Sequence, residues 1–252
     1  MRILVTNDDG IHGPGLTVLE EIAHAISDDV WVVAPDEERS GAGHSLTLSN
    51  PIRYQKLGER RFEVTGTPTD CVVMAVRKIL PEMPDLVLSG VNRGQNIADD
   101  VTYSGTIAAA MEGTALGLKS IALSQVSGIY ENGESFAVAR AYGEGVVKKL
   151  LTLPFGPGVL VNVNFPDCRP DELAGIEVTR QGKRDQNFLL VDERIDARDR
   201  NYYWLGFARE RGNPPAGTDL AAVFQKRISV TPLHMNLTQI DAMEALRGVF
   251  AS

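Results

Sequence analysis

Two adjacent carboxylates stand near the start of the chain, directly after a short apolar run. Residues 3–5 (Ile-Leu-Val) lead into Asn7, Asp8, Asp9 and Gly10, and Gly13-Pro14-Gly15 follows. In open α/β sheets, ligands bind beyond the carboxyl ends of the strands, and magnesium prefers one or two carboxylates plus water and phosphate oxygens. The pattern therefore indicates a metal site, although a polar turn in which Gly10 takes a positive φ accounts for the same residues.

Further polar clusters follow expected strands or open expected helices. They are Arg39-Ser40-Gly41, the run from Ser89 to Asn96, and Tyr103-Ser104-Gly105-Thr106. Because the carboxyl ends of parallel strands meet at one edge of a sheet, we expect these clusters to gather beside Asp8 and Asp9.

The gathered side chains would offer only oxygen ligands. Asp8, Asp9, Ser40 and Asn92 supply two carboxylates, a hydroxyl and an amide carbonyl, a set suited to magnesium, manganese or calcium rather than zinc. Taken singly, Ser40 fits a hydroxyl that caps a backbone group, and Asn92 and Asn96 fit turns beside glycine.

Ser104-Gly105-Thr106 precedes an apolar helical pattern and forms a reasonable anion site. Exposed backbone N–H groups and the positive end of a helix dipole converge at such a position, although a plain serine N-cap has the same appearance. The chain contains no G-x-x-x-x-G-K-[ST] run, and no G-x-G-x-x-G follows the first strand. These absences disfavour a P-loop and an ordinary dinucleotide site. The remaining interpretation is a site that binds a metal ion and a phosphate group.

The four histidines are not assigned a catalytic role. His24 lies inside the first helical pattern, while His12, His44 and His234 lie in expected loops without an identified partner. A loop histidine needs a partner before it can be assigned to catalysis.

Composition limits the class of protein. The chain has 252 residues and a formal net charge of −8, so it lacks the general basic field that a nucleic-acid polymer or an anionic membrane requires. Cys71 and Cys168 are the only cysteines, too few for a disulfide framework. The sequence shows neither a signal-peptide pattern nor an apolar run of membrane-spanning length, so we expect a cytoplasmic protein.

Strand-length apolar segments alternate with helical patterns, which predicts an α/β fold with a parallel sheet covered by helices. The expected strands are 3–5, 30–34, 86–88, 121–123 and 159–163, and residues 52–56 and 61–64 are expected to pair as a small hairpin. Helices are expected after Pro14, from Thr67 to before Pro81, from Ser104 to near Gly117, and from Gln239 to Leu246.

The pattern changes after the strand near residue 159. We predict a core over 1–164 and, over 165–252, an extension of hairpins with a terminal helix rather than an independent domain. Tyr202, Tyr203 and Trp204 could stack a base, but aromatics at strand spacing favour packing or an interface.

With these clusters in order, nearly the whole chain resembles the SurE family, the stationary-phase survival proteins that act as metal-dependent nucleoside monophosphate phosphatases. The resemblance rests on Asn7-Asp8-Asp9-Gly10, Ala34-Pro35-Asp36, Arg39-Ser40-Gly41, Ser45-Leu46-Thr47-Leu48, Gly66-Thr67-Pro68-Thr69-Asp70-Cys71, Ser89 to Asn96, Tyr103-Ser104-Gly105-Thr106, Gly217-Thr218-Asp219 and Ser229-Val230-Thr231-Pro232-Leu233.

The resemblance implies a Rossmann-like three-layer α/β/α domain with a mostly parallel sheet and a C-terminal β-hairpin extension used for oligomerisation, as a homodimer or homotetramer. It implies that one divalent cation per subunit, Mg²⁺ or Mn²⁺, is held by Asp8, Asp9, Ser40 and Asn92. It also implies that the phosphate pocket is lined by Asn96, Ser104, Gly105 and Thr106. The sequence departs from the family chiefly at residues 223–228, which bears on the oligomer more than on the chemistry.

The sequence thus predicts a 5′-nucleotidase that hydrolyses nucleoside monophosphates, with 3′-nucleotides and short polyphosphate as further candidate substrates. Activated water assisted by Asp8 or Asp9 is one attacking group, and Asp8 as a covalent nucleophile is the other. A haloacid-dehalogenase-like phosphatase is disfavoured because its acids follow a D-x-D pattern, and a phospho-receiver module because it needs a further strand-end Asp and a later Lys. A noncatalytic metal-dependent nucleotide sensor would have the same ligands.

Overall fold

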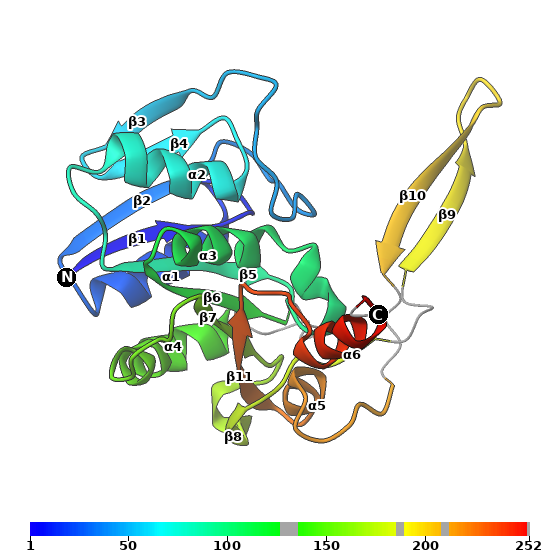
Figure 1. The fold of residues 1–252 in the computed structure, drawn as a ribbon. Coiled ribbons are helices and arrows are strands. Elements are labelled where there is room, and N and C mark those ends of the chain that lie inside the picture. Colours follow the sequence, from blue (N-terminus) through cyan, green and yellow to red (C-terminus); the bar gives the residue numbers. More distant parts are fainter. Residues whose placement is uncertain (127–135, 185–188, 208–211, 251–252) are drawn as a thin grey trace.

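The computed structural model describes residues 1–126, 136–184, 189–207 and 212–250 and contains one large sheet (Figure 1). The nine strands of this sheet lie in the order β3-β4-β2-β1-β5-β6-β7-β11-β8. Their bounds are β1 Arg2–Thr6, β2 Asp29–Pro35, β3 Tyr54–Gly58, β4 Arg61–Val64, β5 Leu86–Arg93, β6 Lys119–Gln125, β7 Val159–Phe165, β8 Gly175–Val178 and β11 Arg227–His234.

The predicted strands are confirmed, and their pairing is mostly parallel. Strands β4, β2, β1, β5, β6 and β7 form a continuous parallel series, while β3 pairs antiparallel with β4, and β11 antiparallel with β7. The predicted hairpin of β3 and β4 exists, and through β4 it extends the main sheet.

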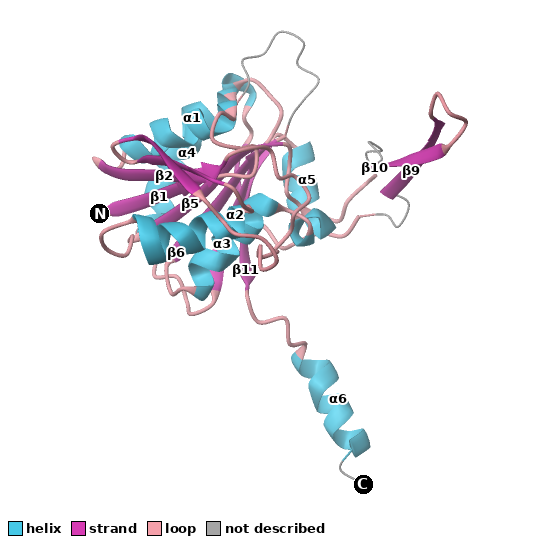
Figure 2. Ribbon diagram, turned by 90° about the horizontal axis from the view of Figure 1, so that it is seen from above, coloured by secondary structure: helices cyan, strands magenta, loops and turns pink. Residues whose placement is uncertain are grey.

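Helices cover both faces of the sheet, which gives three layers (Figure 2). Helices α1 (Pro14–His24) and α4 (Ala137–Leu151) lie on one face, and α2 (Pro68–Met74) and α3 (Gly105–Ala115) lie on the other. The central strands alternate accordingly: Ile3 and Val5 pack in the cluster beneath α1, whereas Leu4 packs beneath α2. Burial on both faces explains why these strands are continuous apolar runs.

Local signals fix the starts of the helices near the candidate site. Pro14 occupies the first turn of α1, and α2 begins with a full capping box between Thr67 and Asp70. Helix α2 continues into a π-helical segment, η1 (Ala75–Ile79), and the helical stretch ends before Pro81 as predicted.

The sheet continues past residue 165. A short 3-10 turn, η3 (Pro170–Glu172), leads from β7 to β8. Strands β8 and β11 complete the sheet, and helix α5 (Asp219–Phe224) packs beside β11. The division of the chain into a core over 1–164 and a C-terminal extension over 165–252 stays a prediction.

Two elements project away from this body (Figures 1 and 2). Strands β9 (Leu189–Ile195) and β10 (Asn201–Phe207) form the predicted C-terminal hairpin as a separate two-stranded sheet, and α6 (Ile240–Phe250) buries none of its residues. None of the helices in the described part of the chain has both the length and the apolar character that a membrane span needs.

Candidate active site

Asp8 and Asp9 lie immediately beyond the carboxyl end of β1, as the sequence predicts. The turn that holds them is tied locally, because the Asn7 side-chain amide donates to the Gly10 carbonyl at 2.8 Å. Gly10 has a φ of 91°, so the turn interpretation of this glycine is also correct. Asp8 is buried, with 4% of its surface exposed.

Asp8 is joined directly to the start of α3. The Thr106 hydroxyl donates to Asp8 Oδ1 at 2.6 Å. A Cβ atom added to Gly105 would lie 2.9 Å from Asp8 Cβ and 3.1 Å from Pro68 Cγ, so only glycine permits this approach. The structure therefore brings the strand-end carboxylate and the helix start into contact.

The end of β5 reaches the same place. The backbone N–H of Arg93 donates to Asp9 Oδ2 at 3.2 Å. The neighbouring Asn92 donates its side-chain NH₂ to the Gly94 carbonyl at 2.9 Å. This bond fixes the amide and leaves its Oδ1 as the atom that can ligate a cation.

The loop that carries Ser40 is attached to Asp8 through the backbone. The Arg39 N–H donates to the Asp8 carbonyl at 2.8 Å. The Ser40 side chain is exposed, and its hydroxyl donates to Glu38 Oε1 at 2.9 Å. The structure thus brings the loop to the carboxylates, while the Ser40 hydroxyl is directed to Glu38.

Ser104 caps α3, as its Oγ accepts the Ile107 N–H at 3.1 Å. The backbone N–H groups of Gly105 and Thr106 precede the first intrahelical bonds. They are the groups that can receive an anion at a helix start. The capping and anion-site interpretations are compatible here.

Asn96 lies in a different buried network. Its side-chain NH₂ donates to Ser124 Oγ at 2.8 Å, and its backbone N–H donates to Asn164 Oδ1 at 2.8 Å. Its carbonyl accepts from the side chains of Asn162 and Asn164. Within the described residues we find no hydrogen bond from Asn96 to Asp8 or to the start of α3.

Burial controls the electrostatics of the carboxylate pair. Burial raises the pKa of Asp8 to about 6. The hydrogen bond from Thr106 lowers this pKa, and the negative charge of Asp9 raises it by a smaller amount. Burial also raises the pKa of Asp9, opposed first by the Arg93 N–H. Both shifts mean that the charged forms lack full compensation from protein groups.

These features fit a divalent cation. Two carboxylates with raised pKa values lie together, and the buried Oδ1 of Asn7 has no hydrogen-bond partner among the described residues. The described residues contain no group of three or more His, Cys, Asp or Glu side chains placed to hold a metal. A cation here would therefore depend on neutral oxygens such as those of Asn92 and Ser40, and these are the ligands that hard cations accept.

Sequence reasoning missed how the Ser40 loop is held. His44 Nε2 lies 3.1 Å from Glu112 Oε2 on α3, and the Gly43 N–H donates to the Tyr103 carbonyl at 3.2 Å. The His44–Glu112 pair joins residues far apart in the sequence, so no local pattern announces it. His12 is exposed, and His234 bonds the nearby Asn236 backbone.

Comparison with known proteins gives consistent matches. Residues 3–188 match the family model described as survival protein SurE. The chain is 61% identical to the 5′-nucleotidase SurE of Parvibaculum lavamentivorans, over 100% of this chain and 92% of that protein. It is 54% identical to the 5′-nucleotidase SurE of Caulobacter vibrioides, over 99% of this chain and 96% of that protein. The crystal structure of the SurE protein from Aquifex aeolicus matches with a TM-score of 0.85 at 40% identity, covering 99% of both chains.

Proposed function

The chain belongs to the SurE family, and from this premise we propose that it is a phosphoric monoester hydrolase, a 5′-nucleotidase that converts nucleoside monophosphates to nucleoside and phosphate. The relatives named above carry this activity in their names. We also propose 3′-nucleotides and short polyphosphate as candidate substrates, because their terminal phosphate presents the same group.

One observation carries the proposal. The strand-end carboxylate of Asp8 contacts both residues at the start of α3, through the Thr106 hydroxyl and the close approach of Gly105. A cation ligated by Asp8 would therefore lie beside the N–H groups that can bind a phosphate. Charge neutralisation and phosphate binding at one point are what phosphoryl transfer requires.

We assign Asp8, Asp9, Ser40 and Asn92 as ligands of one divalent cation, Mg²⁺ or Mn²⁺. Such an ion supplies charge neutralisation on the phosphate and lowers the pKa of nearby water. The Ser40 oxygen keeps its lone pairs for a cation while the hydroxyl hydrogen is donated to Glu38.

The remaining steps belong to the chain itself. The N–H groups of Gly105 and Thr106 hold the non-bridging oxygens, with Ser104 shaping the helix start. Asp8 or Asp9 accepts the proton of an attacking water. The competing route, attack by Asp8 itself, leaves an aspartyl-phosphate that rapid acid quenching would trap. We keep Asn96 as a proposed phosphate-pocket residue on the family resemblance, since its side-chain NH₂ donates to Ser124 Oγ in a separate network.

The exposed apolar surface of the C-terminal hairpin supports assembly into a homodimer or homotetramer. Trp204 and Leu205 of β10 are 60% and 77% exposed, and a lone two-stranded sheet is only marginally stable in water. A second copy of the chain that packs on this surface would bury the exposed side chains and stabilise the two-stranded sheet.

The test is phosphate release from a panel of nucleoside monophosphates with added Mn²⁺ or Mg²⁺, and again with chelator. We expect release that depends on the metal. The matched variant Asp9→Asn should fold normally but lose both turnover and Mn²⁺ binding measured by calorimetry, since it removes one of two carboxylates. Retained turnover in Asp9→Asn at saturating metal would overturn the site assignment. Nucleotide binding without release by the wild-type protein would identify a sensor instead.

A further inference from the structure

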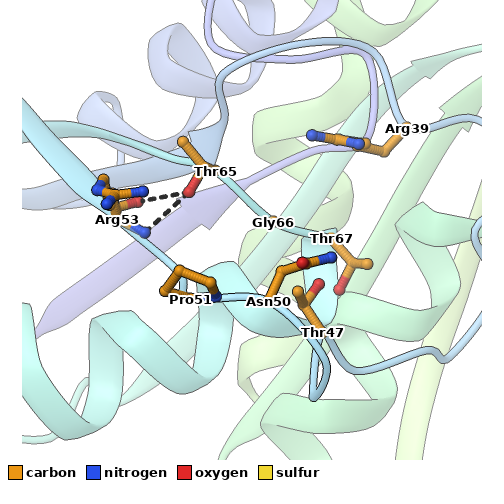
Figure 3. Close-up of a pocket in the computed structure, with 8 residues that line it drawn as sticks. All are labelled: Arg39, Thr47, Asn50, Pro51, Arg53, Thr65, Gly66 and Thr67. Carbon is orange, nitrogen blue, oxygen red and sulfur yellow. Dashed lines mark hydrogen bonds between the residues drawn. The ribbon is translucent and has the colours of Figure 1, made fainter.

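The structure has a surface pocket of about 480 Å³ (Figure 3). This volume falls within the range of about 300–1,000 Å³ typical of small-molecule sites. The pocket is lined by Arg39, Thr47, Asn50, Pro51, Arg53, Thr65, Gly66 and Thr67. In Figure 3, Thr47, Asn50 and Thr67 group together, while Arg53 and Arg39 appear on opposite sides of Gly66.

The lining offers donors and no carboxylate, although the chain as a whole has a net charge of −8. Arg53 bonds Thr65 through its backbone, and its guanidinium has no ion-pair partner in the part of the chain that the structure describes. The buried Nε of Arg39 also lacks a hydrogen-bond partner within the described ranges, although its Nη2 pairs with Glu37 at 3.0 Å and with Asp36 at 3.5 Å. An unpaired guanidinium beside further donors is a suitable site for a phosphate.

The pocket is linked to the active site at two points. Arg39 precedes Ser40, and its N–H donates to the Asp8 carbonyl at 2.8 Å. On the other side Thr67 precedes Pro68, whose Cγ lies 3.1 Å from a Cβ added to Gly105. One pocket residue, Arg39, is therefore the direct neighbour of the proposed metal ligand Ser40, and Thr67 adjoins Pro68, which packs against the start of α3.

We infer that this pocket receives a second phosphate group of the substrate, carried on the sugar of a nucleotide whose first phosphate lies at the start of α3. The inference rests on the proposed nucleotidase function and makes nucleoside bisphosphates better substrates than monophosphates. Arg53 is then a specificity-determining residue that binds the phosphate which is not hydrolysed.

The kinetic test compares adenosine 3′,5′-bisphosphate with adenosine 5′-monophosphate as substrates. We expect kcat/KM of the wild-type protein to favour the bisphosphate about tenfold or more, the factor that one charge-assisted contact of about 1.4 kcal/mol supplies. Arg53→Gln should lower kcat/KM for the bisphosphate about tenfold more than for the monophosphate, mostly through KM. Arg53→Lys should retain part of the preference, because it keeps the charge but not the planar fork.

Arg77→Gln is the matched control, since it makes the same change in charge at an exposed residue outside the pocket. It should behave as wild type with both nucleotides. Equal kcat/KM for the two nucleotides in the wild-type protein, or equal effects of Arg53→Gln and Arg77→Gln, would overturn the inference.

A binding measurement separates failure of this inference from failure of the proposed function. Calorimetric titration in chelator should show that the wild-type protein binds the bisphosphate more tightly than the monophosphate, and that Arg53→Gln removes this difference. Absence of phosphate release from both nucleotides with metal present, together with retained selective binding, would refute hydrolysis but uphold the pocket. Phosphate release from both nucleotides without selective binding of the bisphosphate would support the nucleotidase function and refute the role of the pocket.

Discussion

At the scale of single residues, Thr106 makes a contact in addition to its predicted place in the phosphate pocket. Its hydroxyl donates to Asp8 Oδ1. It therefore orients a carboxylate and can still offer its backbone N–H to phosphate. One residue thereby links the candidate metal ligand to the candidate phosphate site.

Replacing Thr106 by Val should lower Mn²⁺ affinity and kcat/KM by about 10- to 100-fold, since a hydrogen bond to a charged group contributes about 1.5–3 kcal/mol. Thr106→Ser keeps the hydroxyl and should stay within a few-fold of wild type. Calorimetric Mn²⁺ titration and steady-state kinetics measure the two effects. Equal behaviour of the Val and Ser variants would show that the hydroxyl does not orient Asp8.

At the scale of elements, the packing of α1 against β5 depends on one glycine. A Cβ atom added to Gly15 would lie 1.9 Å from the backbone oxygen of Val91. Backbone atoms on both sides cannot move as a flexible side chain can. The close approach therefore fixes how the first helix lies beside the strand that carries Asn92.

Gly15→Ala should consequently lower the free energy of unfolding by about 1–3 kcal/mol, as overpacking does. Gly145 is the control, because it lies on the exposed face of α4 with open space around it. Gly145→Ala should raise stability by about 0.5–1 kcal/mol through helix propensity. Urea unfolding monitored by circular dichroism gives both values, and a Gly15→Ala protein as stable as Gly145→Ala would contradict the packing argument.

The elements that could be predicted are those with local signals. Helix α2 was predicted to begin at Thr67, and the structure shows there a capping box between Thr67 and Asp70. The central strands were predicted from their apolar runs because both of their faces are buried. Contacts such as Thr106 with Asp8 join residues distant in sequence, so only the assumption that strand ends gather at one edge anticipated them.

The place of strand β11 in the sheet could not be read from the sequence. Residues 228–233 fall within the predicted C-terminal extension, and β11 lies inside the main sheet between β7 and β8. This strand contains Pro232, and proline lacks the N–H that a ladder uses. Strand β8 pairs only with residues 227–230 of β11, so Pro232 stands where β11 has one paired neighbour.

At the scale of the whole molecule, the described body leaves large apolar side chains exposed on the projecting hairpin and on α6. Tyr203 and Trp204 are 57% and 60% exposed, and Phe250 is 82% exposed. Such surfaces are characteristic of interfaces between protein chains.

Sedimentation should accordingly give the mass of a dimer or a tetramer for the wild-type protein. The double variant Tyr203→Ser with Trp204→Ser should shift this mass toward the monomer, because it removes the aromatic surface that a second copy covers. Leu153→Ser, at a residue 57% exposed outside the hairpin, serves as the control and should leave the mass unchanged. A strictly monomeric wild-type protein would refute the proposed assembly.

The position of β11 in the sheet also affects how the chain folds during its synthesis. Until residues 227–234 have left the ribosome, β7 has no partner on its outer side and exposes an unpaired strand edge. At ordinary synthesis rates of about 5–20 residues per second, this edge stays open for several seconds after β7 itself has emerged. Nascent chains arrested between β7 and β11 should therefore bind chaperones more strongly than chains arrested after β11.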